Sequence, residues 1–387
     1  MGYQIRNLSV ECLTPVHIGS GVKMKRDMDF LISSQDREIG IIDHRKMMEA
    51  FGEDDINRET INRWVNAIDQ QQSILPLLPS LTKIGDVSKR IRTYRDFNPN
   101  SELREQMHDT QNNPMIPGSS VKGSVRTAIW DAYVNDNSIT YRDVFAYTKR
   151  NGDKVFKDNK LSKKVFAPFS KNRNRIDPNK DILRFLQITD VVFTQNQAIC
   201  EVFKVLTEKN EGWKIKRFDE NGECILKGAK ARGRIKIDQK NLKNNIEKGY
   251  VRGLSPIQSV EDLFEACNQY TAKMLHLEVD FFQEDMDMDN DPVLYEYMNI
   301  IRSLAEEVDN ASKDTCILRM GHGTGYRFMT GNKIFSDNIN DDKLNLIFQS
   351  IRRDWRNIYK DCFYIKSRKI TSFGSPLGFV KLKLLSE

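Results

Sequence analysis

The sequence predicts an α+β fold, with strands preceding helices in each half of the chain. Loose alternation of apolar and polar residues over 3–13 is typical of a half-buried strand. Apolar runs at 30–32 and 39–42 flank a polar turn and predict a hairpin. Apolar residues at helical spacing then predict helices at 44–51 and 55–70.

The second half repeats this order of elements. Residues 183–193 and 199–206 have strand-like composition, and residues 231–237 complete a β meander. In that last strand cations alternate with isoleucine, so one of its faces is cationic. Ser259 followed by Asp262 marks the start of a helix. The other predicted elements are helices at 292–308 and 344–359, a short strand at 316–320 and a closing strand at 378–384.

Composition limits the possible classes of protein. The chain has 387 residues, of which 39% are hydrophobic and 29% charged, so it can build cores and is not globally disordered. Polar, turn-rich residues 149–180 predict a boundary between domains 1–175 and 176–387. The net charge is only +6, so any affinity for nucleic acid must come from local clusters of cations.

The six cysteines are scattered and include no Cys-x-x-Cys pair, which disfavours a zinc ribbon. They fit buried thiols in a reducing compartment. No apolar stretch approaches 18 residues, and charged residues interrupt the only early apolar run, so neither a membrane span nor a signal segment is expected. We therefore expect a cytoplasmic protein with no membrane partner and no cofactor.

The segment Pro114–Arg126 combines several features that suit a phosphate group. Its two prolines discourage helix before Gly118, and glycine lets a backbone approach a ligand closely. Ser119 or Ser120 is a favourable N-cap for a helix predicted over 121–134. The free N–H groups of such a helix would form an anion site.

Two cations accompany this predicted helix start. Lys122 and Arg126 are four residues apart and so share a polar face. One interpretation is a phosphate or nucleic-acid backbone site, and the other is a capped helix that happens to be basic. A nucleotide-hydrolysing P-loop is disfavoured, because Gly118 and Gly123 have the required separation but Ser124 stands where lysine is needed.

Residues 83–113 change the character of the chain, because cations interleave with aromatic and aliphatic side chains. Lys89, Arg90, Arg92 and Arg95 alternate with Ile91 and its neighbours between two turn-forming segments. The segment is either a solvated insertion or a protruding hairpin whose cations contact phosphates.

A glycine-rich loop at 321–325 has three glycines in five positions and is followed by Arg327. Such a density of glycine costs backbone entropy and indicates a geometric requirement. Successive N–H groups there can bind an anion, or the loop is simply a tight turn between elements.

Four stretches together resemble the RAMP superfamily, the RNA-binding subunits of CRISPR effector complexes. They are residues 13–21, 117–126, 319–325 and 373–382, in that order along the chain. The resemblance implies two ferredoxin-like, RRM-type RAMP domains, the first with the basic insertion 83–113. It further implies a non-catalytic subunit of a type III-A Csm complex that binds the 3′ side of guide RNA, ends the backbone filament, and aids guide maturation and antiviral defence.

The same resemblance implies the partners and the RNA contacts. The expected partners are guide RNA, a paralogous backbone subunit, a small helical subunit and recruited trimming nucleases. The residues expected to contact RNA are His17, Gly19, Ser20, Gly21, Lys23, Lys25, Arg90, Arg92, Gly118, Ser119, Ser120, Lys122, Gly123, Arg126, Gly321, His322, Gly323, Thr324, Gly325 and Arg327.

Two enzymatic alternatives accompany this interpretation. His17 could act as general acid or base in RNA cleavage, as a histidine does in distant RAMP relatives. Asp27 or Asp29 could support metal-assisted cleavage.

Residues 285–296 approach an EF-hand pattern, but Pro292 interrupts it and an acidic linker is favoured. We therefore expect no catalytic residue and no metal.

Overall fold

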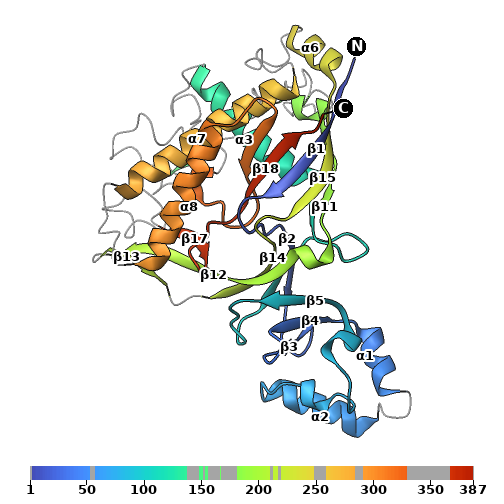
Figure 1. The fold of residues 1–387 in the computed structure, drawn as a ribbon. Coiled ribbons are helices and arrows are strands. Elements are labelled where there is room, and N and C mark those ends of the chain that lie inside the picture. Colours follow the sequence, from blue (N-terminus) through green and yellow to red (C-terminus); the bar gives the residue numbers. More distant parts are fainter. Residues whose placement is uncertain are drawn as a thin grey trace.

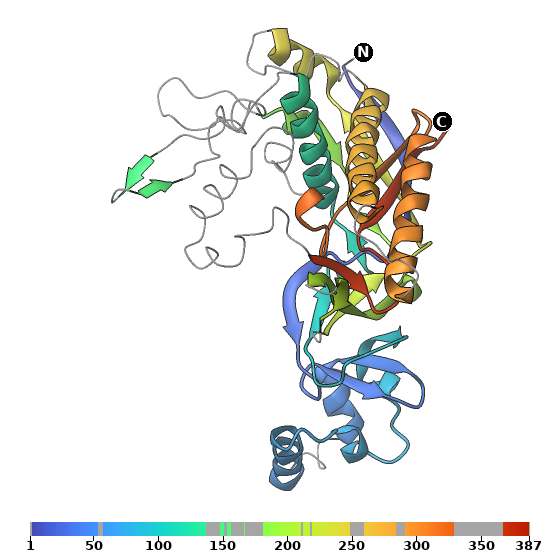
Figure 2. The same cartoon turned by 90° about the vertical axis from the view of Figure 1, so that its left-hand side faces the viewer.

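A computed structural model gives the fold of the chain (Figures 1 and 2). It describes residues 2–52, 57–136, 148–150, 153–155, 166, 181–209, 212–216, 219–247, 259–283, 291–328 and 367–386. The helix predicted at 344–359 and the EF-hand-like residues 285–290 lie outside the described residues.

The first sheet has five antiparallel strands in the order β10-β15-β1-β18-β16. Their bounds are Leu186–Ile188 (β10), Lys230–Ile237 (β15), Gln4–Cys12 (β1), Phe379–Leu384 (β18) and Thr315–Arg319 (β16). The strand predicted at 3–13 is confirmed, and its neighbours on both sides come from the second half of the chain.

Three long helices, α3 (Gly118–Asp136), α7 (Val260–Gln283) and α8 (Pro292–Asp309), pack with this sheet around the main hydrophobic core (Figure 2). The cap predicted for α7 is confirmed, because the backbone N–H of Asp262 donates to the Ser259 hydroxyl and the Asp262 carboxylate accepts from Ser259 N–H. A shorter helix, α6 (Gln239–Glu247), follows β15. None of the described helices is long and apolar enough to cross a membrane.

The second sheet has nine strands, with the main path β2-β6-β14-β12-β5-β4-β3, while β13 and β17 pair with β12. The strand bounds are Gly19–Met24 (β2), Phe30–Ser33 (β3), Glu38–Ile42 (β4), Ser88–Tyr94 (β5), Leu103–Gln106 (β6), Ala198–Lys209 (β12), Gly212–Ile215 (β13), Glu220–Ile225 (β14) and Ser367–Thr371 (β17). Helices α1 (His44–Phe51) and α2 (Arg58–Asp69) pack at its lower end in Figure 1 and confirm the predicted pair.

The remaining elements are short. Two-stranded pairings join β7 (Met115–Ile116) to β11 (Val191–Val192), and β8 (Thr148–Arg150) to β9 (Asp153–Val155). The 3-10 turns are η1 (Leu75–Leu77), η2 (Ile84–Val87), η5 (Ile182–Phe185), η6 (Gln195–Gln197) and η8 (Tyr326–Phe328).

The sheets do not follow the predicted division into residues 1–175 and 176–387. Strand β1 lies between β15 and β18, and β5 pairs in parallel with β12. The mixed α and β content is confirmed, but each of the two large sheets draws strands from both sides of residue 175. Residues 83–113 are also not a protruding hairpin, because β5 lies inside the nine-stranded sheet between β4 and β12.

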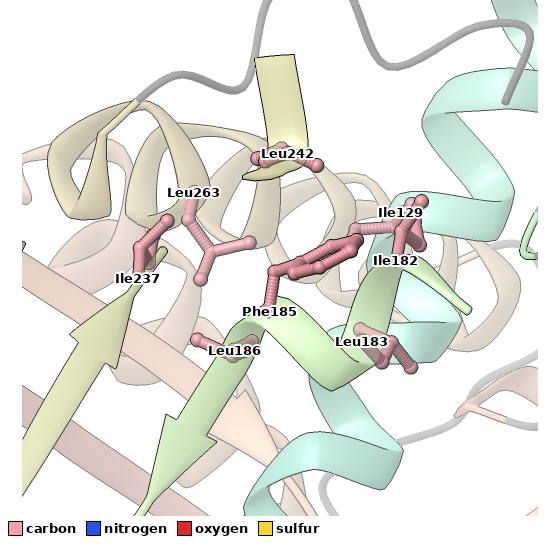
Figure 3. Close-up of a pocket in the computed structure, with 8 residues that line it drawn as sticks. All are labelled: Ile129, Ile182, Leu183, Phe185, Leu186, Ile237, Leu242 and Leu263. Carbon is pink, nitrogen blue, oxygen red and sulfur yellow. The ribbon is translucent and has the colours of Figure 1, made fainter. Parts of the chain in front are cut away.

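A small apolar cavity of about 30 Å³ lies in the main core (Figure 3). Phe185, Leu242 and Leu263 are among its lining side chains, which come from η5, α6, α7 and neighbouring elements. Since the lining side chains are all aliphatic or aromatic, a water molecule would find no side-chain hydrogen-bond partner there. We regard it as a packing gap.

Candidate nucleic-acid interface

The helix predicted at 121–134 begins earlier, at Gly118, so Ser119 and Ser120 lie in its first turn instead of capping it. The Gly118 N–H donates to the Asp190 carboxylate at 2.8 Å. A Cβ at Gly118 would lie 2.0 Å from the carbonyl oxygen of Ile188. The prediction that Gly118 admits a ligand is therefore wrong. The missing side chain instead lets the start of α3 pack directly against the backbone of Ile188.

The polar face of α3 nevertheless borders an open cavity of about 430 Å³. Ser120, Gly123, Ser124 and Thr127 have the spacing of a single helix face, and all four line the cavity. The Ser124 hydroxyl donates to the carbonyl oxygen of Arg319 at 2.9 Å, which fixes α3 to the end of β16. Serine and threonine side chains of α3, together with the backbone at Gly123, therefore border the same solvent-accessible cavity.

Lys122 and Arg126 do not share this face. The Arg126 guanidinium lies 3.6 Å from the Asp181 carboxylate and 3.7 Å above the ring of Phe166. Burial lowers the pKa of Lys122, and Asp181 opposes that shift. The predicted grouping of both cations with the hydroxyls of Ser119 and Ser120 does not hold for Ser120, because at about 100° per residue the cations lie on the side of Ser119 and point away from Ser120.

The glycine-rich loop forms the opposite wall of the cavity, where Gly321 and Thr324 line it. The backbone φ angles of Gly321, Gly323 and Gly325 are 79°, 81° and 72°, in the region that favours glycine. The predicted geometric requirement is therefore confirmed. Two sequence motifs about 200 residues apart meet at one site.

His17 packs against this glycine-rich loop through its contact with His322. Its side chain is 2% exposed, and its Nδ1 lies 2.6 Å from the carbonyl oxygen of Glu223. Because a carbonyl only accepts, Nδ1 carries the proton in the neutral ring. Burial lowers the pKa of His17 to about 4 despite that bond. The ring packs edge-on against Phe203 and His322 at centroid distances of 5.5 Å.

His322 also belongs to a cluster of charged side chains. The Lys369 ammonium lies 2.8 Å from His322 Nε2 and 3.0 Å from the Glu220 carboxylate, and Arg104 pairs with the same carboxylate. Burial opposes ionisation of Glu220, but hydrogen bonds from His322, Arg104 and Lys369 outweigh it and hold the pKa of this carboxyl well below its usual range. His322 thus belongs to a half-buried charged network.

Arg90 and Arg92 are 3% and 1% exposed and face the interior. Two N–H groups of Arg90 donate to the buried Glu223 carboxylate at 3.0 Å, and Arg92 Nε donates to it at 3.2 Å. The prediction that these arginines contact RNA phosphates is wrong, because both guanidiniums are buried against Glu223, and Arg90 also pairs with Glu105. Burial opposes ionisation of Glu223, but the two guanidiniums lower its pKa overall.

The predicted residues on β2 and its flanks lie at the edge of the nine-stranded sheet. Gly19 and Lys23 pair with β6, while Gly21 adopts a φ of 93°. The Ser20 hydroxyl donates to Glu105 at 2.8 Å, and the Lys23 ammonium lies 3.3 Å from Glu102. Lys25 is exposed and follows the strand. These residues are accessible but contribute little unpaired charge.

Arg327 also forms an ion pair inside the protein. Its Nε lies 2.8 Å from the carboxylate of Glu278, and Arg368 Nη2 donates to the same carboxylate at 3.0 Å. Tyr297 adds a hydroxyl donor at 2.6 Å. Glu278 therefore anchors the end of the glycine loop to β17. Arg319, buried between the rings of Phe328 and Phe379, donates to carbonyl oxygens of the same region.

Four further charged residues of this region were not predicted from the sequence: Glu223, Glu278, Arg319 and Lys369. One signal was available for Glu278, because it stands between apolar residues of a predicted helix, whereas Glu223 only precedes the apolar residues 224–226. A charge at such a position requires a buried partner.

The contacts of Asp27 indicate a structural role for this residue. Its backbone φ is 61°, and its carboxylate accepts from Ile74 N–H at 3.1 Å and from Ser73 at 3.4 Å. Arg26 Nε lies 3.0 Å from the same carboxylate. The carboxylate thus holds the segment before η1 in place, and its oxygens are already engaged.

One group of possible metal ligands occurs among the described residues. Glu105, His108 and Glu223 bring one ligand atom each to within 4.8 Å of one another. However, Arg90 and Arg92 already place two guanidiniums on Glu223, and a cation added there would be repelled. Burial also lowers the pKa of His108 to about 4. We interpret this cluster as an internal ion-pair network.

The chain belongs to the RAMP superfamily, whose family model matches residues 9–328. It is similar to the CRISPR system Cms protein Csm5 of Methanocaldococcus jannaschii, with 25% identity over 97% of this chain and 88% of that protein. Two solved structures have a similar fold. A chain of the Csm-crRNA-target RNA ternary complex of a type III-A CRISPR-Cas system aligns with a TM-score of 0.65 and 17% identity over 99% of this chain and 100% of that chain. Csm5 of T. onnurineus aligns with a TM-score of 0.64 and 18% identity over 96% and 99%.

Proposed function

We propose that the protein is a non-catalytic subunit of a type III-A CRISPR effector complex that binds the 3′ side of guide RNA and ends the backbone filament. The observation that carries this proposal is the shared cavity of about 430 Å³, where the α3 motif and the glycine-rich loop meet. Hydroxyl groups from Ser120, Thr127 and Thr324 line it together with glycine backbone. Such groups suit ribose and phosphate contacts without selecting a base.

The relatives support the complex in which this site would operate. The solved chain of similar fold comes from a complex that contains crRNA and target RNA, and the curated relative is a Csm5 protein. The paralogous backbone subunit, the small helical subunit and trimming nucleases are the partners that we infer for this chain. In this role it would aid guide maturation and antiviral defence.

The geometry of the two enzymatic candidates supports a non-catalytic role. His17 is 2% exposed and its pKa is lowered to about 4 by burial, so near pH 7 it is a neutral group without access to substrate. The Asp27 carboxylate is engaged by Ile74, Ser73 and Arg26. Purified protein incubated with labelled guide precursor, with and without Mg²⁺, is expected to leave the RNA intact.

Gly123 offers a direct test of the cavity. It is exposed on α3, and a Cβ built there meets nothing within 4 Å outside its own helix. Gly123→Glu would add a carboxylate at the cavity, whereas Gly123→Gln adds the same volume without charge. We expect Gly123→Glu to weaken guide RNA binding at least tenfold relative to Gly123→Gln in a filter-binding assay.

Both variants are expected to keep or raise the melting temperature, because replacing a helical glycine stabilises a helix by about 0.5–1 kcal/mol. Equal affinities of the two variants would show that RNA does not approach this cavity. To test the position of the guide, the assembled complex can be crosslinked with two guide RNAs, one carrying the crosslinker near its 3′ end and the other near its 5′ end. Crosslinks to this chain from the 5′ probe alone would refute the proposed location.

A further inference from the structure

The five-stranded sheet has one face that the described helices leave open along β1 and β15, whereas α8 reaches the β18 side through Glu307. Residues paired across antiparallel strands share a face, so the register assigns each side chain to one side. Leu8 and Val10 on β1 belong to the core with α3 and α7. Ile5, Asn7 and Ser9 therefore point to the opposite side of the sheet.

This open face is strongly basic. Ile5, Asn7, Ser9 and Glu11 pair with cations on β15, and Ser9 and Glu11 pair again with cations on β18. The cations of the open face are Lys230, Arg232, Arg234, Lys236, Lys381 and Lys383.

Only part of this charge is neutralised. Glu11 lies 3.4 Å from Lys230 and 3.2 Å from Lys381, and Glu307 on α8 lies 2.9 Å from Lys381, so Lys230 and Lys381 are both paired. Arg232 and Arg234 are exposed, and neither makes an ion pair with any other residue that the structure describes. Because they sit two positions apart on one strand, their side chains project about 7 Å apart on the same side. The face thus presents a row of cations suited to successive phosphates.

The same face exposes flat and apolar groups next to the cations. Tyr3 is 54% exposed, and Ile5 is 52% exposed. The Lys236 ammonium lies 4.0 Å from the centroid of the Tyr3 ring. An exposed aromatic ring beside cations is the combination on which unpaired bases stack while their phosphates are neutralised.

We propose that this open face, along β1 and β15, is a second binding surface for single-stranded RNA. Arg232 and Arg234 contact phosphates, and Tyr3 provides a stacking platform for a base. The surface shares no residue with the cavity between α3 and the glycine-rich loop. It therefore lengthens the path of RNA on the protein and does not depend on the cavity for its affinity.

The test uses the full chain, a fluorescein-labelled 20-nucleotide RNA without secondary structure, and anisotropy over a series of salt concentrations. For the double substitution Arg232→Ala/Arg234→Ala we expect at least tenfold weaker binding. The slope of log affinity against log salt should fall by about 1.4, since each phosphate contact to a single strand contributes about 0.7.

Arg45→Ala/Arg63→Ala is the control of equal net charge, because both arginines are exposed on α1 and α2. It should leave the slope unchanged. Arg232→Lys/Arg234→Lys should retain most of the affinity. If the sheet variant behaves like the control variant, the proposal is overturned.

Tyr3 distinguishes single-stranded RNA from any other polyanion. Tyr3→Phe should bind as the wild type does, and Tyr3→Ala should bind at least fivefold more weakly, because base stacking on an aromatic ring contributes that much or more. If Tyr3→Ala has no effect and an acidic peptide competes as well as RNA does, the surface serves an acidic protein partner and the RNA assignment is wrong. Gly123→Glu combined with the sheet variant should give additive losses, so the failure of one site is visible independently of the other.

Discussion

His322 donates its backbone N–H to the backbone carbonyl oxygen of His17 at 2.9 Å, so the glycine-rich loop lies directly on the loop that follows β1. A Cβ at Gly321 would lie 2.4 Å from the same carbonyl oxygen. The two loops are about 300 residues apart in sequence and form one rigid support for the cavity wall.

Gly321→Ala is expected to destabilise the protein by at least about 2 kcal/mol, because it combines a left-handed φ with a steric clash. Gly325→Ala is the matched control, since its φ is 72° but its Cβ would meet only the Gly323 carbonyl oxygen at 4.0 Å. It should lose about 1 kcal/mol. Urea denaturation measures both, and equal losses would contradict the close approach at Gly321.

Acid should destabilise the protein through His17. Its pKa is lowered to about 4 in the folded state, while the unfolded chain titrates near 6.5. Below pH 6.5 the unfolded state therefore binds the extra proton, and stability falls as pH decreases towards 4. At pH 5 the loss is about 2 kcal/mol.

The variant His17→Asn keeps a donor for the Glu223 carbonyl but cannot titrate. Its urea midpoint should fall less than that of the wild type between pH 7 and pH 5. His108, whose pKa is also lowered to about 4, will leave a residual dependence in both proteins. Identical pH profiles for the two proteins would argue against a buried neutral His17.

Glu223→Gln should destabilise the protein by about 3–5 kcal/mol, because it leaves the buried Arg92 guanidinium without its counter-charge and Arg90 with Glu105 alone. Glu105→Gln is the control, since Glu105 is more accessible and pairs with Arg90 alone within this cluster. It should cost about 1 kcal/mol or less. Both values come from urea denaturation at pH 7. A loss at position 223 no larger than at 105 would mean that the arginines find other partners.

Lys122→Ala should reduce the salt slope of RNA binding by no more than about 0.7, equally for RNAs of different sequence. Arg126→Ala should in addition lower the melting temperature, because Arg126 stacks on Phe166 and pairs with Asp181. Filter binding with three unrelated RNAs and thermal melts test both. A loss confined to one RNA sequence would indicate base recognition instead of phosphate contact.

Local patterns predicted the individual elements well. Strand β1, the β3-β4 hairpin and helices α1, α7 and α8 occur within a few residues of their predicted positions. Each has a periodicity or a cap that acts within a few residues, such as Ser259 with Asp262. The order of strands in the sheets was not predictable in this way, because the partners of β1 begin more than 200 residues later.

The site was predicted only in part for the same physical reason. The α3 motif and the glycine-rich loop do meet at one cavity. Both motifs could be recognised in the sequence, because each contains glycines at close spacing. The orientation of the cations was not visible. In β5 the arginines Arg90 and Arg92 face inward and Ile91 faces outward, which reverses the usual pattern. Their buried partner Glu223 lies about 130 residues away, and no local signal connects them.

The position of β1 between β15 and β18 has a consequence for synthesis. Leu8 pairs with Leu384, so one edge of β1 has no strand to pair with until about 370 further residues have left the ribosome. At roughly 5–20 residues per second this delay lasts tens of seconds. During that interval β1 exposes unpaired backbone N–H and C=O groups along this edge, and we expect a chaperone that holds extended segments to protect it until β18 pairs with it.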